Sequence, residues 1–104
     1  MVEQVNHNID LTQAQYLLVK ASEESAEVAQ ACTKALTFGL YSKIPGHEST
    51  HVQDILHEFY ELDAIIEELQ SLGIVPSITK EEEIQIKTEK KRKMKKYMKG
   101  YGVI

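Results

Sequence analysis

The sequence predicts an all-α fold, a bundle of about three helices. Three segments carry apolar residues at helical spacing, and two stretches rich in turn residues separate them. No segment sustains the alternation of a half-buried strand. The 104 residues, 42% hydrophobic and 27% charged, are typical of one soluble globular domain. We therefore expect residues 1–104 to form a single helical domain.

The short chain also favours self-association. A domain of this size buries a modest core, which a further subunit often completes. We therefore expect a homodimer or homotetramer with a four-helix-type core. No apolar run approaches membrane-spanning length, and the first ten residues lack a basic, apolar signal pattern. The expected location is the cytoplasm, without a membrane partner.

The first helix is expected to begin after Asp10, with Asp10 or Thr12 as its N-cap. It should run to about Phe38, because Gly39 follows and glycine commonly ends helices. The single cysteine, Cys32, cannot form an internal disulfide. Because its neighbours are small and mostly apolar, we expect it at a packed position.

The second helix follows a loop. The segment GLYSKIPGHEST, residues 39–50, contains two glycines and a proline and is typical of a loop. The next helix should begin between His47 and Thr50 and continue to about Leu72, with Gly73 as its C-cap. The loop is a natural mouth for a binding site.

The third helix is expected after SLGIVPSITK, residues 71–80, with Ser77 or Thr79 as its cap. Charge is segregated along the chain, because residues 1–83 hold 15 acids and 4 bases, whereas residues 84–104 hold one acid and eight bases. This basic C-terminal helix or tail, at about residues 84–104, is typical of a solvated face, a nucleic-acid patch or a clamp for phosphates held near the acidic body.

Acids interrupt the apolar stripe of the first helix in the stretch EESAEVAQ, residues 23–30. At about 100° per residue, the stripe that runs from Leu17 to Ala35 is centred on Glu24. Glu27 lies about 60° to one side, still on that face, and Glu23 lies about 100° away at the border with solvent. Two carboxylates therefore face inward.

The second helix repeats this arrangement in ILHEFYELDAIIEEL, residues 55–69. Its stripe of leucines and isoleucines is centred on Glu58, and Glu61 lies about 60° to one side. Asp63 and Glu67 fall on the outer face. Glu58 and Glu61 are therefore also predicted to face inward.

Four carboxylates that converge from two packed helices repel one another and lose hydration, which costs several kcal/mol per ion without compensation. A hard divalent cation, Mg²⁺ or Mn²⁺, offsets this cost and prefers oxygen ligands. The predicted metal ligands are Glu24, Glu27, Glu58 and Glu61. The alternative is that these acids pair with lysines or line an oligomer interface.

The paired motifs, E-E-x-x-E at residues 23–27 and E-x-x-E at residues 58–61, resemble those of the MazG-like all-α nucleoside triphosphate pyrophosphatases. The similarity is greatest to the small single-domain, phage-type forms and covers residues 13–70. The family motif is EExxE followed by ExxD, so this chain departs from it at Glu61. Glutamate keeps the negative charge of the aspartate, but its longer side chain places the carboxylate further from the backbone.

The resemblance implies hydrolysis of a nucleoside triphosphate, often a deoxy form, between the α and β phosphates, with release of a monophosphate and pyrophosphate. It also implies homo-oligomers. One or two Mg²⁺ ions would bridge carboxylates and phosphate oxygens and lower the pKa of a bound water. The predicted catalytic residues are Glu24, which faces inward, and Glu23 at the border, which would orient or deprotonate that water.

Positive charge for the leaving pyrophosphate would come from Lys34 on the first helix or from the tail. The tail lysines expected to serve are Lys87, Lys90 and Lys91. Base recognition needs aromatic or amide side chains, and those available are Gln13, Tyr16, Phe38 and Tyr41.

Histidines suggest a weaker alternative. His47, His51, Asp54 and Glu58 would form one stripe if the second helix began early, as in a zinc site. His47 falls in the loop or first turn, however, so we expect His51 and Asp54 to support the carboxylate ligands instead. A ferritin-like di-iron site needs two Glu-x-x-His pairs, and only Glu48-x-x-His51 fits.

The main non-enzyme alternative is a helical interaction module that binds nucleic acid or an acidic partner through its basic tail. Tyr97 and Tyr101 among the lysines support it. The inward-facing acids have no evident use in such a module, and we therefore expect nucleotide hydrolysis instead.

Overall fold

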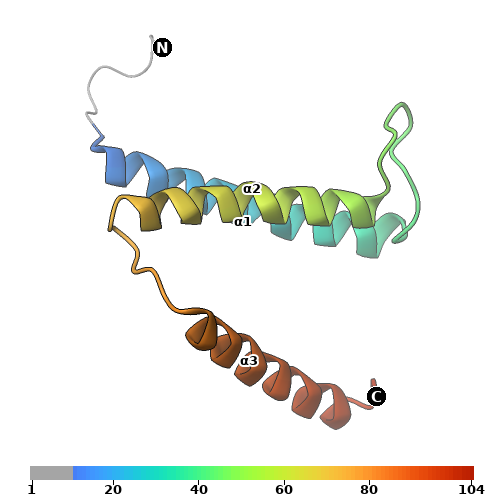
Figure 1. Cartoon of the computed structure of the whole chain (residues 1–104). Helices are drawn as coiled ribbons and strands as arrows, with labels where there is room; N and C mark the ends of the chain where they lie inside the picture. The colour runs from blue at the N-terminus through green and yellow to red at the C-terminus, as the bar shows by residue number, and fades with distance from the viewer. Residues whose placement is uncertain (1–10) are drawn as a thin grey trace.

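Residues 11–104 are described from a computed structural model, in which three α-helices follow one another (Figure 1). They are α1, Gln13–Phe38, α2, His51–Ser71, and α3, Lys80–Gly100. Residues 11–104 contain no strand, apart from an isolated bridge between Lys43 and Thr50. The predicted all-α class is confirmed. Within the same residues, no helix is both long and apolar enough to cross a membrane.

Each helix begins at a threonine. In α1 the Thr12 hydroxyl accepts a hydrogen bond from the Gln15 amide at 3.1 Å, while the Gln15 side chain accepts one from the Thr12 amide at 2.9 Å. Thr50 opens α2 and Thr79 opens α3 with the same reciprocal pair. These capping boxes satisfy backbone donors that a helix start leaves free, and they explain why the helix starts were predictable from sequence.

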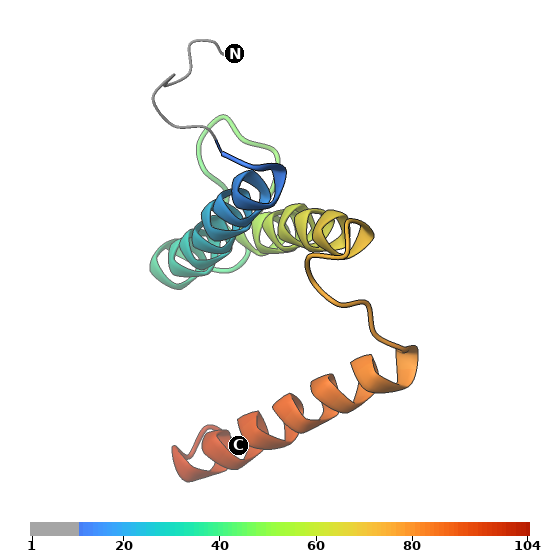
Figure 2. The same cartoon turned by 90° about the vertical axis from the view of Figure 1, so that its left-hand side faces the viewer.

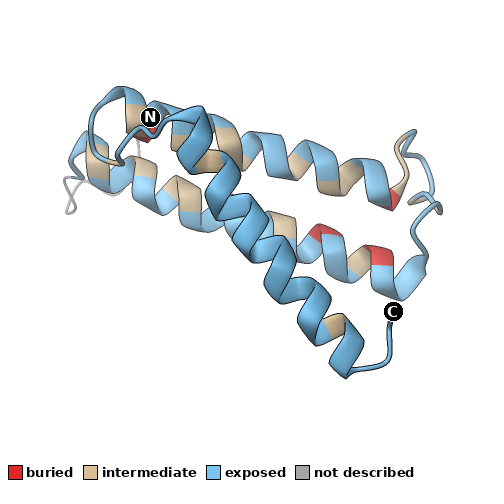
Figure 3. Ribbon diagram, turned by 60° about the horizontal axis from the view of Figure 1, so that its bottom comes forward, coloured by how far each residue is buried: buried red, intermediate tan, exposed pale blue. Residues whose placement is uncertain are grey.

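The helices α1 and α2 form an antiparallel hairpin, side by side along their length (Figures 1 and 2). Ala31 and Ala35 of α1 and Leu69 of α2 are its buried apolar residues (Figure 3). The half-buried residues continue the two predicted stripes, and they include Leu17, Val28, Leu62 and Ile65. Each helix therefore buries the face on which its central glutamate lies.

The opposite faces of the hairpin remain bare. Leu36 is 86% exposed, and Tyr41 and Leu56 are also exposed. Cys32 is exposed as well, so the expectation of a packed position is wrong. The physical reason is that α2 covers only one side of α1, whereas a packed position on the flank requires a further neighbour.

The helix α3 lies apart from this hairpin (Figures 1 and 2). The Cα radius of gyration is 17.8 Å, whereas a compact chain of this length has about 13 Å. Within α3, the Lys87 ammonium lies 2.6 Å from the Glu83 carboxylate, and Arg92 pairs with Glu89 at 2.7 Å. Local ion pairs and its cap support this helix, and no residue of α3 is buried.

The loop between α1 and α2 is fixed onto the start of α2. The His51 amide donates to the Ser42 carbonyl and the Val52 amide to the Leu40 carbonyl, both at 3.0 Å. Gly39 ends α1 with φ of 104°, a conformation that residues with a Cβ rarely adopt. The chain therefore turns sharply and brings the end of α1 against the first residue of α2.

Replacement of the α2 cap by Thr50→Ala should lower the free energy of unfolding by about 1 kcal/mol, because the Gln53 amide loses its side-chain acceptor. The measurement is chemical denaturation followed by circular dichroism. Thr33→Ala is the control, since Thr33 lies inside α1, where alanine is the better helix former. An equal loss in both variants would contradict the capping role.

Candidate functional site

The two central glutamates face the contact between α1 and α2. Glu24 and Glu58 are both half-buried, whereas Glu27 and Glu61 are more exposed at its edge. This order follows the helical angles, because Glu24 and Glu58 lie at the centre of their apolar stripes, whereas Glu27 and Glu61 lie about 60° to the side. The hairpin therefore carries acids from two helices along one seam.

The charges along this seam act on one another. The pKa of Glu58 is raised above its ordinary value, first by burial and then by the negative charges of Glu61, Glu27 and Glu24. The charge of His57 opposes this rise. Ionised Glu58 is therefore under electrostatic stress that a bound cation would relieve.

A cavity of about 220 Å³ opens between the helices beside these acids. We call it the acidic cavity, and its lining residues are Glu27, Gln30, Ala31, Lys34, Ile44, His47, Asp54 and Glu58. It brings together two predicted ligands, the phosphate-binding candidate Lys34 and the supporting residue Asp54. The Asp54 carboxylate accepts a hydrogen bond from the Ser49 hydroxyl at 2.6 Å, which ties the end of the loop to this cavity.

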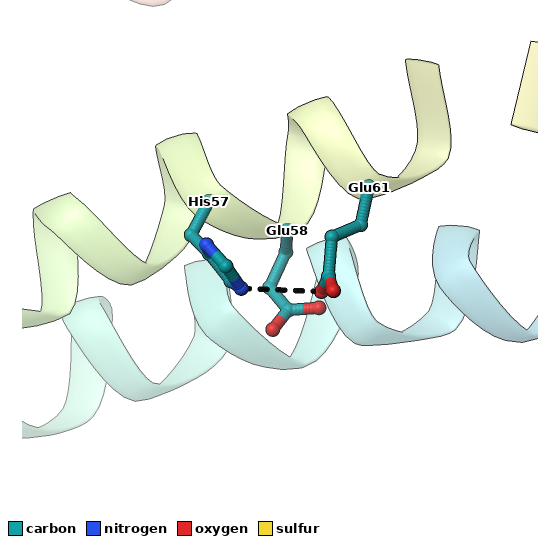
Figure 4. A group of neighbouring side chains, drawn as sticks. All are labelled: His57, Glu58 and Glu61. Atoms are coloured by element: carbon teal, nitrogen blue, oxygen red, sulfur yellow. Dashed lines mark ion pairs between the residues drawn. The ribbon is translucent and has the colours of Figure 1, made fainter. Parts of the chain in front are cut away.

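One group of residues with closely spaced metal-ligating atoms lies on α2 alone. Among residues 11–104, ligand atoms of His57, Glu58 and Glu61 lie within 4.8 Å of one another (Figure 4). Glu24 and Glu27 do not join this group. The carboxylate oxygens of Glu58 and Glu61 are donors of the kind that a hard divalent cation prefers, and Glu24 and Glu27 of α1 are near enough to raise the pKa of Glu58.

His57 is a member of this group that is not among the ligands predicted from sequence. Its imidazole Nε2 lies 3.4 Å from Glu61 Oε1 in an i,i+4 pair. Figure 4 shows the side chains of His57 and Glu61 converging from adjacent turns of α2. The signal in the sequence is the spacing of four residues, which places His57 and Glu61 on the same side of α2.

The predicted catalytic residue Glu23 lies outside the acidic cavity. It is exposed, and its carboxylate lies 3.0 Å from the Lys20 ammonium. This hydrogen bond is the main reason that the pKa of Lys20 is raised. Glu23 therefore holds a surface ion pair beside Glu24, at the border where the helical angle places it.

The tail lysines are not brought to the acidic cavity. Lys87 bonds to Glu83 and lines a separate depression between α2 and α3, in which Asp63 also lies. Lys90 and Lys91 are exposed on α3. Within one chain, Lys34 is therefore the predicted phosphate-binding residue that shares a cavity with the acids.

His51 is buried, but it does not line the acidic cavity. Its ring stacks on Phe38 with centroids 5.8 Å apart, and its Nδ1 has no hydrogen-bond partner. A buried polar atom left without a partner costs on the order of 1–3 kcal/mol. Such atoms are rare, because most buried polar groups in folded proteins have a hydrogen-bond partner.

A second cavity, of about 510 Å³, lies on this side of the loop. We call it the loop pocket, and its lining residues are Lys34, Phe38, Ser42, Lys43, Ile44, Pro45 and His51. Lys34 and Ile44 also line the acidic cavity, so the two cavities are neighbours. Sequence patterns gave no sign of this pocket, because it forms only when the loop folds back onto α2.

Glu58→Gln should raise the melting temperature at neutral pH by a few degrees. The folded-state pKa of Glu58 is raised, so its ionised form opposes folding, and stability falls as pH rises from the ordinary carboxyl value through the folded-state pKa. The gain should therefore disappear at pH values below about 4. Thermal unfolding measured at a series of pH values tests this prediction. The control is Glu67→Gln, a substitution at an exposed residue of the same helix. A gain that is the same at all pH values would argue against the charge effect.

A scan of protein-family models and searches of curated protein sequences and of solved structures find nothing that matches the chain.

Proposed function

We propose that the protein is a Mg²⁺-dependent nucleotide pyrophosphohydrolase, with Mn²⁺ as a substitute, that cleaves a nucleoside or deoxynucleoside triphosphate between its α and β phosphates. The observation that carries the proposal is the seam of acids on α1 and α2 beside a cavity that Lys34 also lines. The motif resemblance supports the same chemistry and a cytoplasmic role in nucleotide metabolism.

In this proposal Glu24, Glu27, Glu58 and Glu61 hold the metal. When bound, the ion supplies positive charge that stabilises the phosphate oxygens as the α–β bond breaks. Lys34 adds a cation at the same cavity and offsets the charge of the leaving pyrophosphate. Glu24 or Glu23 accepts the proton of the attacking water. To accept this proton, Glu23 must first release Lys20. The ion pair between Glu23 and Lys20 is exposed and therefore weak in water.

The departure of Glu61 from the family pattern has a structural counterpart. Its side chain reaches far enough to pair with His57, and an aspartate would be one methylene shorter. We propose that the pair holds Glu61 at the edge of the seam. The Glu61 carboxylate would then exchange His57 for the metal when the ion binds.

We also propose that the protein acts as a homodimer or homotetramer. The chain exposes 8316 Å², whereas a compact monomer of its 11.8 kDa exposes about 5,900 Å². The excess is comparable to what each subunit of an obligate dimer buries, on the order of 1,000–2,500 Å². The acidic hairpin and the basic α3 carry opposite charge, so α3 of one copy would suit the hairpin of another.

The position of α3 also favours a second candidate, binding of nucleic acid or an acidic partner. The lysines of its last three turns are exposed, as are Tyr97 and Tyr101. Such binding would depend on phosphate contacts and would weaken steeply with salt. It makes no use of the acids on the hairpin, and for that reason it ranks second.

The purified protein with Mg²⁺ should release pyrophosphate and a monophosphate from at least one common nucleoside or deoxynucleoside triphosphate. Glu24→Gln and Glu58→Gln should each lower turnover by about 100-fold or more, because charge stabilisation of the phosphates depends on the metal. Glu67→Gln, on the exposed side of α2, should keep full turnover. Product analysis by ion-exchange chromatography separates pyrophosphate from orthophosphate.

Two outcomes would count against this assignment. If both glutamine variants retained turnover, the seam would not be the metal site. No release of pyrophosphate from any common triphosphate, together with oligonucleotide binding at low salt, would favour the second candidate. Glu61→Asp adds information, because higher turnover there would show that the departure from the family pattern lowers catalysis.

Sedimentation equilibrium should give a mass two or four times 11.8 kDa. High salt should lower the association constant if α3 docks on the acidic hairpin, because salt screens the attraction. A mass of one chain at concentrations used for the assay would contradict the proposed assembly.

A further inference from the structure

We infer that the second half of α3 docks in the depression between α2 and α3 of a second copy of the chain, and that the two copies make this contact reciprocally. The inference rests on the proposed self-association, for which it names the two surfaces. It makes no use of the acidic cavity or of its metal.

The depression between α2 and α3 has a volume of about 470 Å³ and combines apolar and acidic side chains. The apolar ones are Phe59, Tyr60 and Ile66 of α2, and the acids are Asp63 and Glu67 of α2 and Glu83 of α3. Within residues 11–104, Asp63 and Glu67 form no ion pair. The depression therefore suits an occupant that offers both apolar surface and positive charge.

The second half of α3 offers this combination. Its apolar residues lie at positions i, i+3, i+4 and i+7, which span about 100° of the helix surface. The four residues are Met94, Tyr97, Met98 and Tyr101, and we call them the α3 stripe. The stripe is largely exposed. The Val103 amide donates to the Met98 carbonyl at 2.8 Å, which holds the chain end beside the stripe, and Lys90 and Lys93 line the same surface.

The α3 stripe cannot occupy the depression of its own chain. The first turns of α3 border that depression through Glu83 and Lys87, and Tyr97 follows Lys87 by ten residues, or about 15 Å along the helix axis. The two surfaces share no lining residue, and α3 runs apart from the hairpin (Figures 1 and 2). A straight helix cannot return its second half to the site that its first half borders, so the occupant belongs to another chain.

Charge selects the hairpin of a second copy over a second α3. Residues 84–104 carry eight bases and one acid, so two α3 stripes would repel each other. Residues 1–83 carry 15 acids and 4 bases, and Asp63 and Glu67 bring this negative charge to the depression. Apolar contact drives most protein association, while complementary charge selects the partner and fixes its register.

A reciprocal contact also accounts for the large exposed surface. The chain exposes 8316 Å², about 2,400 Å² more than a compact monomer of its mass. A two-fold dimer makes the same contact twice, so each copy both covers its stripe and fills its depression. Nucleic acid would meet the lysines of α3, but it would leave the depression unfilled, because the acids there repel phosphates.

The test exchanges the charges of the two surfaces. Asp63→Lys/Glu67→Lys and Lys90→Glu/Lys93→Glu should each lower the self-association constant by about 100-fold or more, because like charges then face each other. An equimolar mixture of the two variants should restore association as a complex with one copy of each, since both contacts in it again join opposite charges. Sedimentation equilibrium measures both effects.

Two variants with the same change in charge serve as matched controls. Glu48→Lys/Glu68→Lys alters exposed acids of the loop and of α2 outside the depression. Lys95→Glu/Lys99→Glu alters exposed lysines that lie about 110° or more from the centre of the α3 stripe. Both should associate like the wild type. Glu67→Gln, which removes one charge and reverses none, should also stay associated.

A fluorescence measurement identifies which surface is covered. The chain has no tryptophan, so Tyr97→Trp introduces a single reporter in the stripe. Its emission should shift to shorter wavelength as the protein concentration rises through the dissociation constant, because docking removes the ring from water. Leu36→Trp, at an exposed position of α1 outside the depression, should show no shift. This measurement reverses no charge, so it decides the inference even if a reversed variant fails to fold.

Failure of this inference differs from failure of the proposed function, because the readouts are mass and emission and not turnover. If the reversed variants associate like the wild type, or if their mixture does not associate, the docking surfaces are wrong while hydrolysis stands. If the mixture associates but no triphosphate is cleaved, the docking surfaces stand and the enzyme is overturned. A shift of Leu36→Trp in place of Tyr97→Trp would assign the contact to another face.

Other occupants of the stripe have a distinct result. A wild-type protein that stays monomeric, with a Tyr97→Trp emission that shifts only on addition of an oligonucleotide or of anionic lipid vesicles, would assign the stripe to that partner. It would overturn docking on a second copy.

Discussion

The packing of α1 against α2 determines the rest of this structure. The contact is narrow, with Ala31, Ala35 and Leu69 as its buried apolar residues, and it must also accommodate carboxylates from both helices. Burial favours close approach, while the mutual repulsion of the acids and their loss of hydration oppose it. The raised pKa of Glu58 expresses this conflict. Strain of this kind is common where a site is kept for function.

The loop links this seam to the second cavity. Backbone hydrogen bonds from His51 and Val52 hold residues 40–42 against the start of α2, and the same fold-back buries His51 beneath Phe38. Ser49 reaches Asp54 at the mouth of the acidic cavity. One short segment therefore shapes both cavities, and a change in the loop would alter the acidic end and the aromatic end together.

The helix α3 poses the opposite physical problem. It has a cap, local ion pairs and a strong excess of lysine, but none of its residues is buried. In proteins most of the stability of a helix comes from packing of its apolar face against other elements and not from helix propensity. Its charge is opposite to that of the hairpin, so an acidic surface is the partner that would stabilise it. The small core of the hairpin favours self-association for a similar reason, because a further subunit would add to the buried surface.

Most of the fold was predictable because local chemistry specifies it. Thr12, Thr50 and Thr79 open the helices, each with a capping partner three residues later. The stripes that contain Glu24 and Glu58 face each other, as their helical angles require. However, the angles between residues of one helix give no information on where the neighbouring helices lie. The exposure of Cys32 depends on such neighbours and could not be predicted in this way. The approach of His57 to Glu61, by contrast, follows from their spacing of four residues within α2.

By itself, the sequence determined the class, the helix starts and the faces that carry the acids, because each depends on residues within one or two turns. Only the tertiary structure decided which acids meet, where α3 lies and which side chain is buried without a partner. Those properties depend on contacts between distant segments. The sequence placed His51 as a supporter of the metal ligands, whereas the fold buries it in the neighbouring pocket, because the loop returns over the first turn of α2.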